Sequence, residues 1–224
     1  MCSAESEVGH WGDVVPGIKF SRGLLVVGLT GNFGTGKSTV SGLFRKKGAK
    51  VLNADRLAHE VFWKGHPLFR KIRSLFPEGK ERLGRKQIAE VVFMNQKKRR
   101  QLESLVHPYV FMRIGKELER TRERVAILEV PLLFESGFDR QCDRTVVVHS
   151  PQEKVFRRLG QKGFSKAEIR ARWRAQMPLW EKMRRADYRI DNSGGLAETR
   201  RQVVEVWKDL KNERSLTTHG KRQK

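Results

Sequence analysis

The stretch GLTGNFGTGKSTV, residues 28–40, places four glycines within nine residues and then ends on a lysine followed by two hydroxyl residues. Residues 31–38 satisfy the pattern G-x-x-x-x-G-K-[ST], which forms a loop around phosphate groups. The apolar run Leu24–Leu29 precedes the loop and a helical pattern follows it, which is the context that such a loop requires. The sequence therefore predicts a phosphate-binding loop (P-loop) between a buried strand and a helix.

Each residue type in this loop has a chemical reason to be there. Glycine adopts positive φ without steric cost, so the backbone can turn its N–H groups toward an anion. Lys37 carries a compact charge that reaches the β- and γ-phosphates, and the Ser38 hydroxyl is the expected Mg²⁺ ligand. The residues predicted to bind a nucleoside triphosphate are Gly31, Gly34, Thr35, Gly36, Lys37, Ser38 and Thr39.

Five short apolar runs are predicted to be strands. They are Leu24–Leu29, Lys50–Asn53, Val125–Val130, Thr145–His149 and Tyr188–Ile190. The clearest of them are rich in Val, Leu and Ile without polar alternation, which favours burial on both faces and parallel pairing. Long helical patterns separate them. We therefore expect an α/β fold of the P-loop NTPase type, with a doubly wound five-stranded parallel sheet.

The order of these patterns also predicts the domain organisation. We expect a flexible leader at residues 1–22, a P-loop core at 23–66, 125–150 and 178–211, a helical substrate-side insertion at 67–124, a small helical lid at 151–177 and a basic tail at 212–224. Pro108 lies inside a helical pattern of the insertion and removes a backbone hydrogen bond. The helix is therefore predicted to kink or restart near His107.

Two helices, Pro151–Leu159 and Lys166–Met177, are predicted in the lid, joined by the sequence GQKGFS. Pro151 suits the first turn of a helix. Ser165, followed three residues later by Glu168, is typical of a capping box. The glycine-containing joint fits a mobile flap, and it fits an ordinary pair of packed helices equally well.

Three carboxylates lie at or just beyond the carboxyl ends of predicted strands, at the edge where open parallel sheets bind ligands. Asp55 has two interpretations: a base that accepts the proton of a hydroxyl nucleophile, or the N-cap of the helix RLAHEV. Glu129 either positions Mg²⁺-bound water or is a buried acid paired with a basic neighbour. Glu135 follows a proline-containing turn, where it can contact a substrate.

The lid region carries basic residues that can close over a transferring phosphoryl group. Arg157, Arg158 and Lys162 flank the joint between its helices, and Arg172 lies on the second helix. His107, in LVHPYV, is either a substrate contact or a structural histidine at a helix break.

The composition indicates a soluble chain with an unusually basic surface. The 224 residues include 47 Lys and Arg against 25 Asp and Glu, a formal net charge of +22. This excess attracts anions but does not choose among them, and the sequence lacks the motifs of a dedicated nucleic-acid binder. Two cysteines, Cys2 and Cys142, predict reduced thiols in the cytoplasm, and no run is long enough to span a membrane.

Five blocks in order resemble the dephospho-CoA kinase family, whose members phosphorylate the ribose 3′-hydroxyl of dephospho-CoA from ATP. They are GLTGNFGTGKSTV, VLNADRLAHEV, FMNQKKRRQLESLVHPYV, LEVPLLFESG and RARWRAQMPLWEKMRRADYRIDNSG. The resemblance runs from about Leu24 to Leu210. It departs from the family at Asn53, which replaces the first of two acids, at Gly84, and at Gln161, which replaces a lid arginine.

The resemblance implies roles for particular residues. Asp55 is implied as the catalytic base, and Asn192 is implied to lie near the adenine of ATP. Lys37 and Arg158 are predicted to be catalytic as well, although the departure at Gln161 leaves the cation that contacts phosphate open between Arg157, Arg158 and Lys162. The residues implied to contact the acceptor substrate are Asp55, His107, Leu132, Glu135 and Arg172. Mg²⁺ at Ser38 and ATP are the expected cofactors.

The predicted function is therefore ATP-dependent phosphorylation of dephospho-CoA to coenzyme A and ADP, without a membrane or specific nucleic-acid partner. One alternative is another small-metabolite kinase on the same scaffold, because a fold does not determine a substrate. A second alternative, suggested by the charge of +22, is an ATPase stimulated by nucleic acid.

Overall fold

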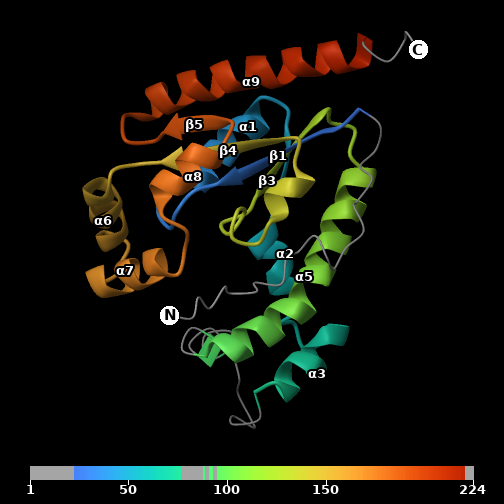
Figure 1. The fold of residues 1–224 in the computed structure, drawn as a ribbon, viewed down its shortest axis with the longest axis vertical. Helices are drawn as coiled ribbons and strands as arrows, with labels where there is room; N and C mark the ends of the chain where they lie inside the picture. Colours follow the sequence, from blue (N-terminus) through green and yellow to red (C-terminus); the bar gives the residue numbers. More distant parts are fainter. Residues whose placement is uncertain (1–22, 77–87, 89–90, 93–94, 220–224) are drawn as a thin grey trace, which may run out of the picture. The chain divides into compact units, whose positions relative to one another are not determined.

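The computed structural model describes residues 23–76, 88, 91–92 and 95–219 (Figure 1). The predicted leader and the last five residues lie outside this range, as does Gly84 in the insertion. The chain divides into two compact units. The first runs up to Leu52 and resumes at Leu118, and the second is Asn53–Glu117.

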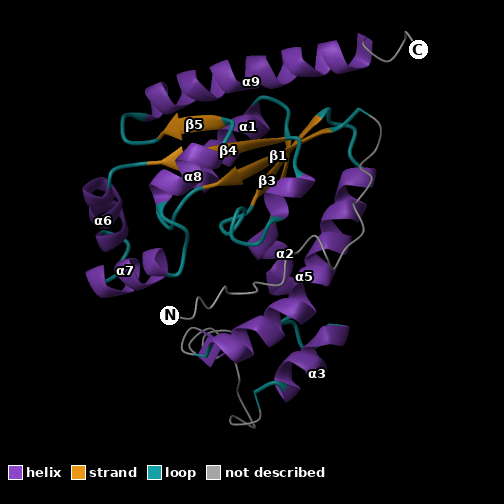
Figure 2. Ribbon diagram, viewed as in Figure 1, coloured by secondary structure: helices purple, strands orange, loops and turns teal. Residues whose placement is uncertain are grey.

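The first unit is built on a five-stranded sheet with the order β2-β3-β1-β4-β5 (Figure 2). Its strands are β1 (Leu25–Thr30), β2 (Lys50–Asn53), β3 (Val125–Glu129), β4 (Arg144–His149) and β5 (Tyr188–Asp191). The pairs β1–β3, β1–β4 and β4–β5 are parallel. Every strand lies within one residue of its predicted bounds, and the predicted fold class is confirmed.

Helices and turns cover both faces of this sheet, because successive residues of β1, β3 and β4 are buried and therefore both faces of these strands are covered. Val27 and Leu29 of β1 pack with helices α1 (Lys37–Lys46) and α9 (Leu196–His219) on one face. On the other face, Gly28 lies against Leu133, which belongs to the turns after β3, and against Cys142. A short 3₁₀ helix (Phe138–Gln141) lies between β3 and β4 in the chain. Helix α8 (Leu179–Arg185) comes directly before β5.

The lid segment contains α6 (Gln152–Gly160) and α7 (Lys166–Arg174). The predicted capping box at Ser165 and Glu168 is confirmed. Pro151, however, is the N-cap of α6 rather than a first-turn residue. The prediction that the second helix extends to Met177 is wrong, because α7 ends at Arg174.

At the C-terminal end, α9 continues to His219, so the predicted start of the basic tail at residue 212 falls inside a helix. None of the helices among the described residues is both long and apolar enough to cross a membrane.

The second unit contains α2 (Ala54–Glu60), α3 (Pro67–Ser74) and α5 (Gln96–Glu119), whose last two residues belong to the first unit. The Glu60 carboxylate joins α2 to α5, since it accepts hydrogen bonds from Tyr109 and from Arg113, the latter at 3.0 Å. Helix α5 runs through Pro108 without interruption, so the prediction of a restart is wrong.

Candidate functional site

Residues 31–36 connect β1 to α1, and together with residues 37–39 in the first turn of α1 they form what we call the phosphate cradle. Its three glycines, Gly31, Gly34 and Gly36, have φ of 144°, 84° and 99°, values that favour glycine. Gly36 is the N-cap of α1, and no side chain caps this helix. A Cβ atom on Gly36 would lie 1.9 Å from Nδ2 of Asn192, so no larger residue fits here. The conformation therefore depends on glycine.

The cradle presents unused donors at the start of α1. Within the described part of the chain, the amide N–H groups of Gly34, Gly36 and Ser38 donate to no protein acceptor. The Ser38 and Thr39 side chains beside them are exposed. Unpaired amides and the positive end of a helix dipole favour an anion at this point.

The Lys37 ammonium group lies over the same loop. Its Nζ donates to the carbonyl oxygens of Gly31, at 2.8 Å, and of Asn32, at 3.3 Å. The Thr35 hydroxyl also donates to the Asn32 carbonyl, at 2.9 Å, so the loop is internally braced. A lysine held against main-chain carbonyls at the mouth of the cradle places a positive charge where phosphate oxygens would bind.

Ser38 lies beside Glu129, the last residue of β3. The Ser38 hydroxyl donates to Oε1 of Glu129 at 2.9 Å, and Ser41 donates to Oε2 at 3.1 Å. Glu129 is 5% exposed and accepts hydrogen bonds from two hydroxyl groups. The interpretation of Glu129 as a buried acid paired with a basic neighbour is therefore wrong. A hydroxyl and a carboxylate side by side are the hard oxygen ligands that Mg²⁺ prefers.

These two residues fit Mg²⁺ only together with other ligands. Among the described residues that were searched, no group of three or more His, Cys, Asp or Glu side chains could hold a metal by itself. Mg²⁺ in phosphoryl-transfer sites usually takes one or two protein ligands, water and substrate phosphates. The pair therefore fits a magnesium–nucleotide complex better than a permanent metal centre.

Asn192, directly after β5, supports the cradle from the neighbouring part of the sheet. Its Nδ2 donates to the Thr35 carbonyl at 2.8 Å, and its Oδ1 accepts from the Thr199 hydroxyl at 3.0 Å. The residue is 8% exposed. The Asn192 side chain is thus hydrogen-bonded to the main chain of the cradle. That Asn192 lies near the adenine of ATP remains a prediction.

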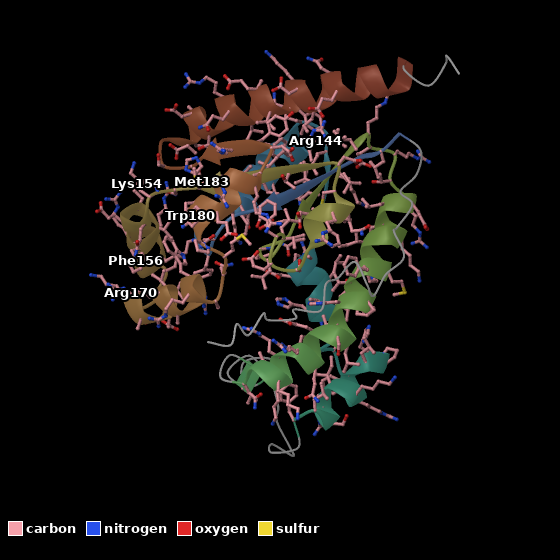
Figure 3. All side chains as sticks on the ribbon, in the orientation of Figure 1. Arg144, Lys154, Phe156, Arg170, Trp180 and Met183 are labelled. Carbon is pink, nitrogen blue, oxygen red and sulfur yellow. The ribbon has the colours of Figure 1, made fainter. Side chains whose placement is uncertain are left out.

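Two cations on the inner side of α6 bind the same strand end. Arg158 donates to the Asn192 carbonyl at 2.9 Å, and Lys154 donates to the Ser193 carbonyl at 2.8 Å. Figure 3 labels Lys154 on this helix. Arg157 and Lys162 are exposed. The sequence did not decide which of the three lid cations Arg157, Arg158 and Lys162 contacts phosphate. Among them, Arg158 donates to Asn192, which is itself hydrogen-bonded to the cradle.

Glu135 joins the turn after β3 to the end of the lid. Its Oε1 accepts from the Met177 amide and pairs with Nζ of Lys182, both at 2.8 Å. Among the described residues, no hydrogen-bond partner reaches its buried Oε2. Leu132, three residues before it, is 38% exposed. In this turn Leu132 is therefore the exposed side chain, whereas Oε2 of Glu135 is a buried acceptor without a hydrogen bond.

Lys182 is fully buried on α8 and also donates to the Pro131 carbonyl at 2.8 Å. Burial lowers the pKa of this lysine, and the neighbouring Glu135 opposes that effect by favouring the charged form. The buried ammonium thus fixes both ends of the turn Pro131–Glu135.

Asp55 and His107 belong to the second unit. Asp55 lies in the first turn of α2, but the N-cap is Asn53, whose side chain accepts from the Arg56 amide at 2.9 Å. The N-cap interpretation of Asp55 is therefore wrong. Burial lowers the pKa of His107 to about 4, so its imidazole is neutral at pH 7 and brings no positive charge to a phosphate.

Three contributors to the site were missed by the sequence interpretation: Phe33, Gln176 and Lys182. Phe33 occupies a variable position of the motif, and Gln176 and Lys182 lie in the last block of the family resemblance, where no role was predicted for them. Their importance comes from partners far away in the chain, for which the residue types give no local indication.

Comparison with known proteins agrees with this geometry. The sequence model of the dephospho-CoA kinase family matches residues 25–198. A protein of Aquifex aeolicus named dephospho-CoA kinase is 40% identical over 189 residues, which cover 82% of this chain and 96% of that protein. The crystal structure of TT1252 from Thermus thermophilus has a TM-score of 0.76 at 37% identity, covering 84% of this chain and 98% of that one.

More distant structures share the fold alone. Shikimate kinase from Bacteroides thetaiotaomicron has a TM-score of 0.50 at 18% identity, covering 84% of this chain and 98% of that one. The overall fold of this chain is thus shared with that kinase.

Proposed function

Because the chain belongs to the dephospho-CoA kinase family, we propose that it transfers the γ-phosphoryl group of ATP to the ribose 3′-hydroxyl of dephospho-CoA. The observation that carries this proposal is the uncapped start of α1, where unpaired amides, the Lys37 ammonium group and the Ser38–Glu129 pair meet. This combination suits a polyphosphate with a divalent cation.

In the proposed reaction the 3′-oxygen forms a bond to the γ-phosphorus while the bond to the β,γ-bridging oxygen breaks. Asp55 accepts the proton of the 3′-hydroxyl, and ADP leaves with the bridging oxygen. Asp55 is suited to this role because it lies two residues beyond the end of β2, and Asn53 performs the capping of α2 in its place.

The phosphates would be bound by the cradle, with Lys37 and Arg158 balancing the charge that develops on the transferring group. Ser38 and Glu129 are the residues that would hold Mg²⁺, which shields the phosphate charge when it is bound. We propose Leu132, Glu135, His107 and Arg172 as contacts of the acceptor. Of these residues, the exposed Leu132 offers an apolar contact beside Glu135.

A cytoplasmic location is part of the proposal, because the reaction consumes ATP and the sequence contains no disulfide framework.

The proposal is tested by ADP release with dephospho-CoA as acceptor, measured beside adenylates, shikimate and gluconate. We expect turnover with dephospho-CoA and little with the others. Asp55→Asn and Lys37→Ala should each lower kcat by orders of magnitude in a folded protein. Lys47→Ala is the control, because Lys47 is an exposed lysine at the opposite end of α1.

Preference for another acceptor would replace the proposed substrate but retain the kinase chemistry. Hydrolysis of ATP that rises with random RNA or DNA, and falls with salt, would instead support the nucleic-acid-stimulated ATPase. Full activity of folded Lys37→Ala would refute the phosphate assignment.

A further inference from the structure

Phe33 belongs to two parts of the molecule at once, to the cradle by sequence and to the lid by its contacts. Its amide donates to Oε1 of Gln176 at 2.9 Å, and its carbonyl oxygen accepts from Nε1 of Trp173, also at 2.9 Å. Trp173 lies on α7 and Gln176 directly after it. The main chain of the cradle is therefore attached to the lid at this residue.

The Phe33 ring packs against the small apolar core of the lid, which consists of Val155, Leu159 and Ile169. The Phe164 ring meets it edge-on, with centroids 5.2 Å apart and planes at 84°. At the next residue, a Cβ atom on Gly34 would lie 2.5 Å from Cδ1 of Leu159. The cradle and the lid are thus in close contact over two successive residues.

The same two rings hold a cation. The Arg172 guanidinium carbon lies 4.5 Å from the centroid of Phe33 and 4.8 Å from that of Phe164. Both distances are within the range of cation–π attraction. Arg172 is otherwise exposed, so these rings are what restricts a long side chain that would sample many rotamers in water.

We propose that Phe33 is a positioning residue, which acts through Arg172. Its ring keeps the guanidinium beside the cradle, so that the arginine meets the polyphosphate without first being ordered. This inference rests on the proposed function for the identity of the reaction, but the positioning itself concerns any triphosphate bound in the cradle. It also assigns Arg172 to the donor nucleotide as well as to the acceptor.

The chemistry of the guanidinium supports this assignment. Arginine binds phosphate oxygens through a planar fork, and the gain is larger when the fork is already oriented. Because Phe33 is part of the loop that would bind the phosphates, its contact with Arg172 ties the guanidinium directly to that loop.

Phe156 offers a matched control. It is a half-buried ring of the same lid core, its ring meets Trp173 edge-on at 5.8 Å, and the Arg170 guanidinium lies over it at 5.8 Å. Figure 3 labels Phe156 and Arg170 in this part of the molecule. In the described structure no hydrogen bond or ring contact joins Phe156 to the cradle. Phe33→Leu and Phe156→Leu therefore remove similar packing, and only the first removes one of the two rings that hold Arg172.

The experiment measures kcat with dephospho-CoA at saturating ATP and, independently of any acceptor, the Kd of a non-hydrolysable ATP analogue by calorimetry. We expect Phe33→Leu to lower kcat about tenfold and to raise the Kd of the analogue about tenfold. Phe156→Leu should change neither, although both variants lower the melting temperature. Phe33→Tyr, which keeps the ring, should behave as the wild type.

A double-mutant cycle tests whether Phe33 acts through Arg172. In an Arg172→Ala background, Phe33→Leu should cause no further loss. Equal losses in Phe33→Leu and Phe156→Leu would overturn the proposal, because lid packing would then explain them. Full additivity with Arg172→Ala would also overturn it. Failure of the wild type with dephospho-CoA would refute the proposed substrate alone, since the analogue still reports on the cradle.

Discussion

The side-chain amide of Asn192 donates to the carbonyl oxygen of Thr35, 157 residues earlier in the chain, with Nδ2 and O 2.8 Å apart. The same asparagine accepts from Thr199 on α9 and leaves no room for a Cβ atom on Gly36. The end of β5 and the start of α9 therefore determine the shape of the cradle.

Replacing Asn192 by Ala should loosen the cradle. We expect the free energy of unfolding to fall by about 1–3 kcal/mol, because the Thr35 carbonyl and the Thr199 hydroxyl lose a buried partner. Binding of inorganic tripolyphosphate, which has no adenine, should also weaken. Gln202→Ala is the control, since it removes two hydrogen bonds to the Asp191 backbone at 2.8 and 2.9 Å. Unchanged tripolyphosphate binding in Asn192→Ala would limit its role to the adenine.

Glu129→Gln should raise the Mg²⁺ concentration needed for half-maximal activity. The substitution keeps the size of the side chain but removes the charge beside Ser38, and we expect kcat to fall on the order of 100-fold. A Mg²⁺ titration of ADP release measures both effects, and EDTA should abolish activity reversibly. Ser41→Ala removes the contacts of its hydroxyl with Oε2 and with the Ser38 carbonyl oxygen, but keeps the carboxylate charge, and should leave the Mg²⁺ requirement nearly unchanged. The same requirement in Glu129→Gln and wild type would argue against Glu129 as a metal contact.

Lys182→Met should destabilise the protein strongly. The substitution removes the fully buried ammonium group that pairs with the Glu135 carboxylate, which is then left as an unpaired charge. We expect the free energy of unfolding, measured by chemical denaturation, to fall by about 3–5 kcal/mol. The double variant Lys182→Met, Glu135→Gln should regain part of that loss because no uncompensated charge remains. Lys208→Met, on the exposed face of α9, is the control. A double variant no more stable than the single one would show that packing, not charge, dominates.

The stability of the protein should decrease on acidification because of His107. Its pKa is lowered from 6.5 to about 4, so between these values the unfolded chain binds a proton that the folded chain does not. The unfolding free energy therefore falls as pH drops through this window, by up to about 3 kcal/mol. Denaturation of wild type and His107→Gln from pH 7 to pH 4 should show a shallower fall in the variant. Parallel curves would mean that another group causes the acid sensitivity.

Local patterns account for the parts of the fold that the sequence predicted well. The strands were predicted to within one residue because continuous apolar runs indicate burial on both faces wherever they occur. The wrong helix bounds have tertiary causes. Helix α5 passes Pro108 with Val106, Val110 and Phe111 buried around it, and α7 stops at Arg174. After that stop, Gln176 and Met177 bind Phe33 and Glu135 instead of continuing the helix.

The sequence by itself determined the sheet, the cradle and the family, because glycine dihedrals, a lysine–serine pair and apolar runs have their effects within a few residues. Only the tertiary structure decided which side chains support the cradle. Asn192 meets Thr35, and Gln176 meets Phe33 across 143 residues, because the sheet and the lid bring distant segments together. A hydrogen bond depends on distance and angle in space, and neither is encoded in the identity of the residues that form it.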